Sequence, residues 1–217
     1  MTKIYIPFPK PKVHKIEVPY SSGSIDVTSI GGDVTYNDRE GIQLEFKAYC
    51  KSYAEWKALL HEIAAHLHGK KLEMICDDDK YYYYMVRLEL DSTRSNNVTS
   101  PVVLSGSAEP FKYALFGPGE KWLWDPFNFE TGIITKLENV VVNGSKSVLI
   151  PNDSIYTVPT FEVKSSNNLK LNFKGKTYEM PKADTYYFPQ VRINHDVLSL
   201  DFTGSGTVSI IFVGRYL

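Results

Sequence analysis

The chain has 217 residues, enough for one large domain or two small ones. Its charges nearly cancel, with 24 Lys and Arg against 25 Asp and Glu, so it lacks the basic surplus of proteins that grip nucleic acid by its phosphates. Its apolar runs are too short to span a bilayer, and two cysteines, Cys50 and Cys76, are too few for a disulfide framework and are expected as buried free thiols.

The first 20 residues are rich in proline and lysine. Pro7, Pro9, Pro11 and Pro19 resist both a helix and a central strand. We expect either an extended arm, which a partner surface orders, or a loose tail.

Residues 24–50 are predicted to form strands. The segment GIQLEFKAYC alternates in polarity, a period typical of a strand with one buried and one wet face. The buried face is predicted to carry Ile42, Leu44, Phe46 and Ala48, and the wet face Gln43, Glu45 and Lys47.

One helix is predicted over residues 53–68. Ser52 is a good N-cap, and Glu55 three residues later completes a capping box. Apolar residues then recur at helical spacing, and Gly69 follows where a left-handed C-terminal cap is wanted. These apolar residues are Trp56, Leu59, Leu60, Ile63 and Leu67.

A hairpin is predicted over residues 70–90. One strand alternates through Leu72, Met74 and Cys76, and the next strand carries the tyrosines 81–84 and continues to Leu90. The loop between them is Asp77–Lys80, where aspartates bond their own backbone without needing an ion. Aromatic residues on both faces near the turn suggest that both faces meet protein.

Residues 98–114 are predicted to form one or two further strands, and an unusually aromatic loop follows them. Five aromatic residues lie between 116 and 129, a stretch that glycines and prolines punctuate. Such a loop either packs on the core or binds a neighbour.

From residue 132 onward, short strands recur with turn signals between them. The segments NG, SSNN, KGK and TGSG fit hairpin turns. We therefore expect two domains, residues 1–131 and residues 132–217, the second being an antiparallel β-sandwich. The fold class is mainly β with one α-helix.

The sequence carries no catalytic signature. It has no nucleophile elbow, phosphate loop or dinucleotide fingerprint, and scattered carboxylates give glycosidase chemistry no positive support. Asp77 and Asp79 do not follow the EF-hand pattern, and no two of the helix histidines have the i, i+4 spacing of a zinc site. We expect neither an enzyme nor a metal or other cofactor.

Carbohydrate binding is the alternative that the residues leave open. Small β-sandwiches often hold sugars on exposed aromatic rings. The C-terminal half offers Tyr178, Tyr186 and Tyr187 as weak candidate sugar contacts. On this reading the chain is a carbohydrate-binding module that aids adsorption to a host surface.

Several sequence elements, taken in order, resemble the distal tail protein family, often called Dit, of long-tailed phages that infect Gram-positive bacteria. They are the capped helix YAEWKALLHEIAAHLHGK, the hairpin LEMICDDDKYYYYMVRLEL, then GSAEPFKY and WLWDPFNFETG. The C-terminal GSGTVSIIF is also similar. The resemblance covers residues 25–132 well and the remainder more loosely.

The resemblance implies a structural role in the virion, at the tail tip, for a protein made in the host cytoplasm. The N-terminal domain would form a homohexameric ring, which in some members is stacked as two rings, and a galectin-like C-terminal sandwich would hold other baseplate proteins. The implied partners are the chain itself, the tail tube and the tail-fibre or receptor-binding proteins. Candidate interface residues are Tyr82, Tyr84, Phe116, Trp122, Trp124, Phe127 and Phe129.

Overall fold

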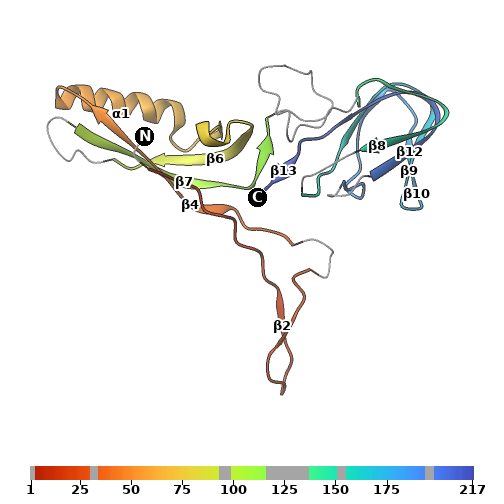
Figure 1. Cartoon of the computed structure of the whole chain (residues 1–217), viewed down its shortest axis with the longest axis horizontal. Coiled ribbons are helices and arrows are strands. Elements are labelled where there is room, and N and C mark those ends of the chain that lie inside the picture. The colour runs from red at the N-terminus through yellow and green to blue at the C-terminus, as the bar shows by residue number, and fades with distance from the viewer. Residues whose placement is uncertain (1–2, 30–33, 93–98, 116–136, 151–154, 194–197) are drawn as a thin grey trace. The chain divides into compact units, whose positions relative to one another are not determined.

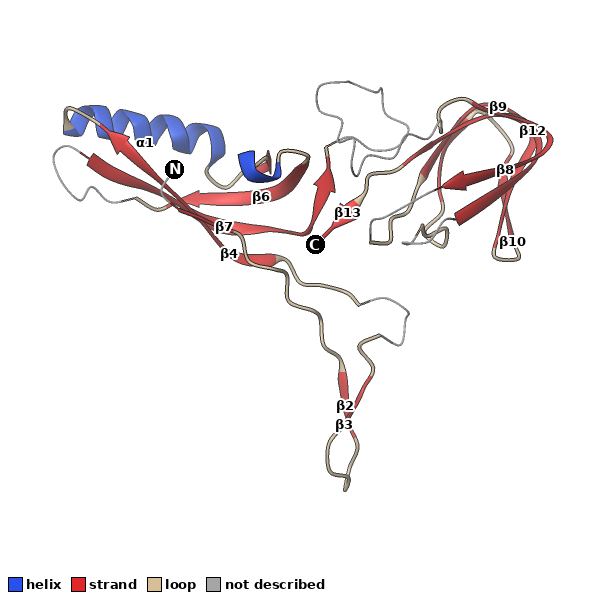
Figure 2. Cartoon of the chain, viewed as in Figure 1, coloured by secondary structure: helices blue, strands red, loops and turns tan. Residues whose placement is uncertain are grey.

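The computed structural model describes residues 3–29, 34–92, 99–115, 137–150, 155–193 and 198–217. The chain divides into two compact units, one of Met1–Met74 and Tyr84–Lys112 with Leu217, the other of Ile75–Tyr83 and Tyr113–Tyr216. The domain boundary predicted at residue 131 lies outside the described residues. Both units are built mainly of strands, and α1 is the one α-helix of the described residues, which confirms the predicted class (Figures 1 and 2).

The first unit is organised around a sheet with strand order β1-β4-β7-β6-β5. β4 pairs antiparallel with both β1 and β7. The predicted alternation in β4 is confirmed, because Ile42 and Leu44 are 0% and 5% exposed while Gln43 and Lys47 face solvent. The strands are β1 (Lys3–Tyr5), β4 (Arg39–Tyr49), β5 (Lys71–Met74), β6 (Tyr82–Leu90) and β7 (Thr99–Ala114).

Helix α1 spans Tyr53–Leu67 and lies against this sheet. The Ser52 hydroxyl accepts a hydrogen bond from the Glu55 amide at 3.2 Å, which confirms the predicted N-cap. The Glu55 carboxylate accepts the amide of Lys51, one residue before the N-cap, at 2.8 Å. Gly69 adopts φ +71° just after the helix, as its C-terminal cap requires. Trp56, 1% exposed, anchors the helix in a cluster with Cys50 and Val102.

The predicted hairpin is confirmed, with a longer connection than expected. β5 and β6 pair antiparallel, with Met74 opposite Tyr84. Cys76 does not belong to the strand, contrary to the prediction, because the chain turns into the 3-10 helix η1 (Asp77–Asp79). The Asp79 amide donates to the Cys76 carbonyl at 3.0 Å and closes this turn. Both cysteines are buried free thiols, as predicted.

The N-terminal arm is longer than the sequence predicted. Strands β2 (Lys15–Glu17) and β3 (Ser24–Asp26) pair antiparallel as a separate two-stranded sheet. The Lys12 amide donates to the Thr35 carbonyl, and the Asn37 amide to that of Lys10, both at 2.8 Å, so residues 10–12 and 35–37 form the base of the arm. Strands were predicted over residues 24–50, and β3 and β4 lie in this range, β4 beginning at Arg39.

The second unit is an antiparallel sheet with strand order β10-β9-β12-β8, and β11 pairs with the first part of β9. One core of buried apolar side chains lies between its strands, with Phe161, Phe202 and Leu169 fully enclosed. The end of β7 joins this unit, where the Ala114 amide donates to Gly214 beside β13 (Arg215–Tyr216). The remaining strands are β8 (Val140–Ile150), β9 (Thr160–Phe173), β10 (Lys176–Met180), β11 (Asp184–Tyr187) and β12 (Leu198–Ile211).

Three of the four predicted hairpin turns in this half are wrong. NG, SSNN and TGSG lie inside the continuous strands β8, β9 and β12, and only KGK connects two strands. Two of the glycines instead allow neighbouring strands to approach closely. A Cβ on Gly204 would lie 2.1 Å from the Asn168 carbonyl oxygen, and a Cβ on Gly206 would lie 2.3 Å from the Ser165 carbonyl oxygen. Register shifts flank the same positions and allow the long strands to bend.

Candidate functional site

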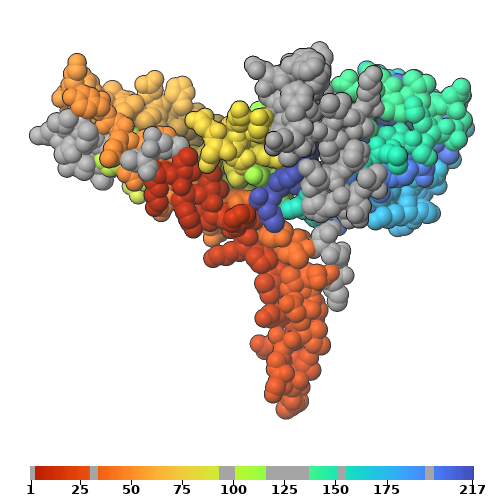
Figure 3. All heavy atoms as spheres, viewed as in Figure 1, coloured from red at the N-terminus to blue at the C-terminus, as the bar shows by residue number. Residues whose placement is uncertain are grey.

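The arm, described over residues 10–29 and 34–37, exposes apolar side chains. It stands away from the main sheet of the first unit (Figures 1 and 3). Ile16 and Ile25 face each other across the two strands and are 55% and 56% exposed. An isolated two-stranded hairpin is only marginally stable in water, and exposed contiguous apolar surface marks a protein contact. Val13, Val18, Tyr20 and Val34 are exposed as well.

Polar bonds order the arm although its apolar residues stay uncovered. The Val27 amide donates to the His14 carbonyl at 2.9 Å, and the His14 amide to the Thr28 hydroxyl at 3.0 Å. The hydrogen bonds from Thr28 lower the pKa of the Asp26 carboxyl. The described arm therefore has a defined, hydrogen-bonded conformation and differs from the loose tail, which was one of the two alternatives for the N-terminal segment.

Arg39 ties the root of the arm to the sheet. It is 2% exposed, its Nη1 donates to the Pro7 carbonyl at 2.8 Å, and its Nε donates to Pro110 at 2.9 Å. The guanidinium lies 5.7 Å from the Phe8 ring centroid and 5.3 Å from that of Tyr84. Burial lowers the pKa of Arg39. Its Nη2 has no hydrogen-bond partner, which is so for no other buried side-chain nitrogen or oxygen in the described part of the chain.

Arg39→Met is expected to release this root. Methionine fills much of the space but donates neither hydrogen bond, so local stability should fall by about 2 kcal/mol. Exchange of the Lys12 and Asn37 amides, which form hydrogen bonds across the root, should then rise about thirtyfold by mass spectrometry, while exchange in β9 and β12 stays unchanged. Arg192→Met, which removes only a contact with the Tyr156 ring, is the matched control. Equal exchange at the root in both variants would contradict this role.

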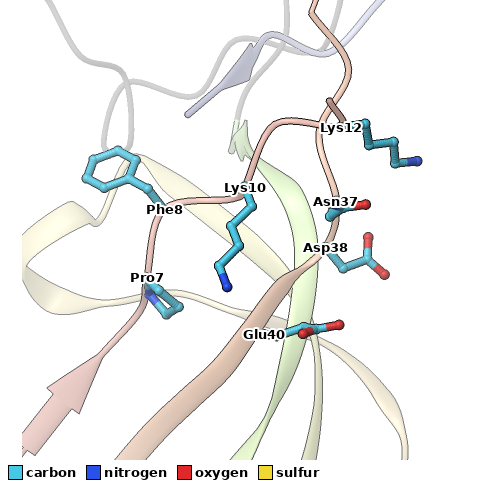
Figure 4. Close-up of a pocket in the computed structure, with 7 residues that line it drawn as sticks. All are labelled: Pro7, Phe8, Lys10, Lys12, Asn37, Asp38 and Glu40. Carbon is cyan, nitrogen blue, oxygen red and sulfur yellow. The ribbon is translucent and has the colours of Figure 1, made fainter. Parts of the chain in front are cut away.

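A shallow hollow of about 350 Å³ lies at the root of the arm (Figure 4). Phe8 is 77% exposed at this place. In Figure 4, Lys10 extends toward Pro7 and Glu40, and Lys12 points away. A lining of mixed charge beside one exposed ring fits a protein contact better than a small-molecule pocket. The lining residues are Pro7, Phe8, Lys10, Lys12, Asn37, Asp38 and Glu40.

The turn between β5 and β6 concentrates negative charge at the surface. Asp77 and Asp78 are exposed, and Ile75 beside them is 50% exposed. Burial raises the pKa of the Cys76 thiol, and the three neighbouring carboxylates raise it further. Among the described residues, no three His, Cys, Asp or Glu side chains gather as a metal site, and no described helix could cross a membrane.

The predicted interface residues have different environments. Tyr84 is 8% exposed and lies beneath Arg39 in the core of the first unit, so it is not a surface residue. Tyr82 is half-buried, with its ring centroid 4.9 Å from that of Tyr216. The other predicted interface residues lie outside the described part: Phe116, Trp122, Trp124, Phe127 and Phe129.

Two of the three candidate sugar contacts pack against the core of the second unit. Tyr178 and Tyr186 pack against it, with ring centroids 4.9 and 6.1 Å from that of Phe188. The Tyr186 hydroxyl also bonds the backbone of Lys182. Only Tyr187, 60% exposed, offers an open ring.

Two features of this surface were missed in the sequence. The sequence analysis predicted strands over residues 24–50 but no hairpin with the segment before them, although SSGS at residues 21–24 is a turn signal that could have revealed it. Arg39 carries no local signal, because its partners Pro7 and Pro110 are distant in the chain.

Comparison with known proteins finds a similar fold in a solved structure. No protein-family model matches the chain, and no curated protein matches it. A solved structure, the Dit protein of phage SPP1, matches with a TM-score of 0.62 over 100% of this chain and 93% of that chain. The two sequences are 11% identical. That structure is described as a paradigm of the hub adsorption apparatus in phages that infect Gram-positive bacteria. The resemblance seen in the sequence is therefore confirmed at the level of the fold.

Proposed function

We propose that this chain is a structural protein of a phage tail, located at the tail tip, where it forms a hexameric ring. The ring connects the tail tube to the receptor-binding or tail-fibre proteins. The observation that carries the proposal is the full-length likeness to the SPP1 hub protein, which spans both units of the chain.

The exposed arm supports assembly on physical grounds. A ring closes through head-to-tail contacts, so each subunit must present two different, complementary patches. The arm supplies one such patch, since its apolar side chains have no cover within the described chain. Its root, held by the buried Arg39, fixes the direction in which the patch is presented.

The charge of the chain suits a ring through which DNA passes. Its formal net charge is −1, and a strongly basic wall would hold DNA rather than let it slide. On the main sheet, Lys71 pairs with Glu109 at 2.5 Å, so the charge of this lysine is balanced locally. We assign the chain no reaction, and its role is to bind other proteins of the tail.

Light scattering of the purified full-length chain tests the proposal. The chain mass is 24.7 kDa, so a hexamer should give about 148 kDa. A particle that keeps the mass of one chain at every concentration would contradict a ring-forming role.

A further inference from the structure

The arm raises the question of which surface covers it. The segment before its first strand carries the exposed Lys10 and Lys12, and no acidic residue occurs before Glu17. At the root of the arm these lysines line the hollow together with Asp38 and Glu40. Neither lysine forms an ion pair within the described part of the chain. Val13 and Ile16 follow them with more than half of their surfaces open. A surface that is apolar and bears negative charge is therefore complementary to this part of the arm.

The chain itself carries a surface of that kind. In the turn between β5 and β6, Ile75 is half exposed next to the carboxylates of Asp77 and Asp78. Neither aspartate forms an ion pair with any described residue. The turn thus has the opposite charge to Lys10 and Lys12 of the arm, and it has an exposed apolar residue of its own.

We propose that the arm of one copy docks on the β5–β6 turn of a second copy of this chain. Lys10 and Lys12 lie against Asp77 and Asp78, and the apolar residues of the arm cover Ile75. The partner is a second copy because the arm and the β5–β6 turn occur on the same chain. Repeated head-to-tail contacts require both surfaces on each subunit. This inference rests on the proposed ring and names the contact that closes it.

Charge reversal tests the contact. One variant carries Lys10→Glu and Lys12→Glu, the other Asp77→Lys and Asp78→Lys. Each variant alone juxtaposes like charges at every contact and should need at least a tenfold higher concentration to assemble. An equimolar mixture restores both kinds of contact in an alternating ring, so it should assemble as the wild-type chain does.

The controls separate this inference from the proposed function. Lys164→Glu with Lys176→Glu makes the same charge change on exposed sandwich positions and should leave assembly unchanged. Circular dichroism melting confirms that every variant folds, and light scattering reports assembly.

Each remaining outcome has one meaning. A wild-type chain that stays a monomer removes the ring and the contact together. If wild-type assembles and either reversed variant assembles equally well, the contact is wrong while the ring stands. If a single chain carrying all four substitutions assembles but the mixture does not, the arm meets the turn of its own chain and the proposed contact between copies is wrong.

Discussion

Gly106→Ala is expected to lower the stability of the first unit by about 3 kcal/mol. A Cβ at this position would lie 2.1 Å from the Arg87 carbonyl oxygen and 3.0 Å from the Leu88 Cα. Because these are backbone atoms of the neighbouring strand, no change of rotamer relieves the contact, and β6 and β7 must move apart. Urea denaturation, followed by amide exchange of peptides from β6 and β7, measures the loss.

Gly41→Ala is the control for this prediction. Gly41 has φ +81°, but a Cβ there would meet no atom within 4 Å. Its cost is limited to the left-handed backbone conformation, about 1–2 kcal/mol. A Gly106→Ala effect no larger than that of Gly41→Ala would show that the two strands do not approach as closely as described.

Trp56→Ala should destabilise the first unit by about 4 kcal/mol. Trp56 is 1% exposed and is the large side chain with which α1 contacts Cys50 and Val102. Its removal leaves a cavity that the short helix cannot fill. Loss of amide protection in α1 at low urea concentration, measured by mass spectrometry, checks the prediction.

Tyr53→Ala on the same helix is the matched control. Tyr53 is 58% exposed, so its loss should change stability by less than about 0.5 kcal/mol. Protection of β9 and β12 should be equal in both variants and the wild-type chain. Equal effects of the two substitutions, or lost protection in the sandwich with Trp56→Ala, would contradict the assignment of α1 to the core of the first unit.

Elements with local signals were predictable from the sequence. The helix was predicted to within one residue, because Ser52, Glu55 and Gly69 are caps that act on neighbouring backbone groups. The faces of β4 and the pairing of β5 with β6 followed from polarity of period two. These signals depend on residues only a few positions apart, so they can be recognised in the sequence without knowledge of the rest of the fold.

The bends in the second unit were not predictable in this way. A glycine that is needed in a turn cannot be distinguished in the sequence from a glycine that allows a neighbouring strand to approach closely. Gly204 and Gly206 are of the second kind, since carbonyl oxygens of β9 occupy the space of their absent side chains. Only the paired strand distinguishes the two cases.

The candidate site could be predicted only in part from the sequence. The proline-rich segment indicated an arm that needs a partner, and the structure shows an exposed hairpin there. Tyr84 was taken for a contact residue, yet it supports the buried Arg39. A tyrosine suits both an interface and a core that contains a cation, so composition alone does not separate these roles.

Electron microscopy of negatively stained full-length protein tests the central claim most directly. The claim is that copies of this chain cover one another's exposed arms and close a ring. We expect class averages of a hollow annulus with sixfold symmetry. Solitary globules of single-chain size, persisting when the cognate tail components are added, would contradict it.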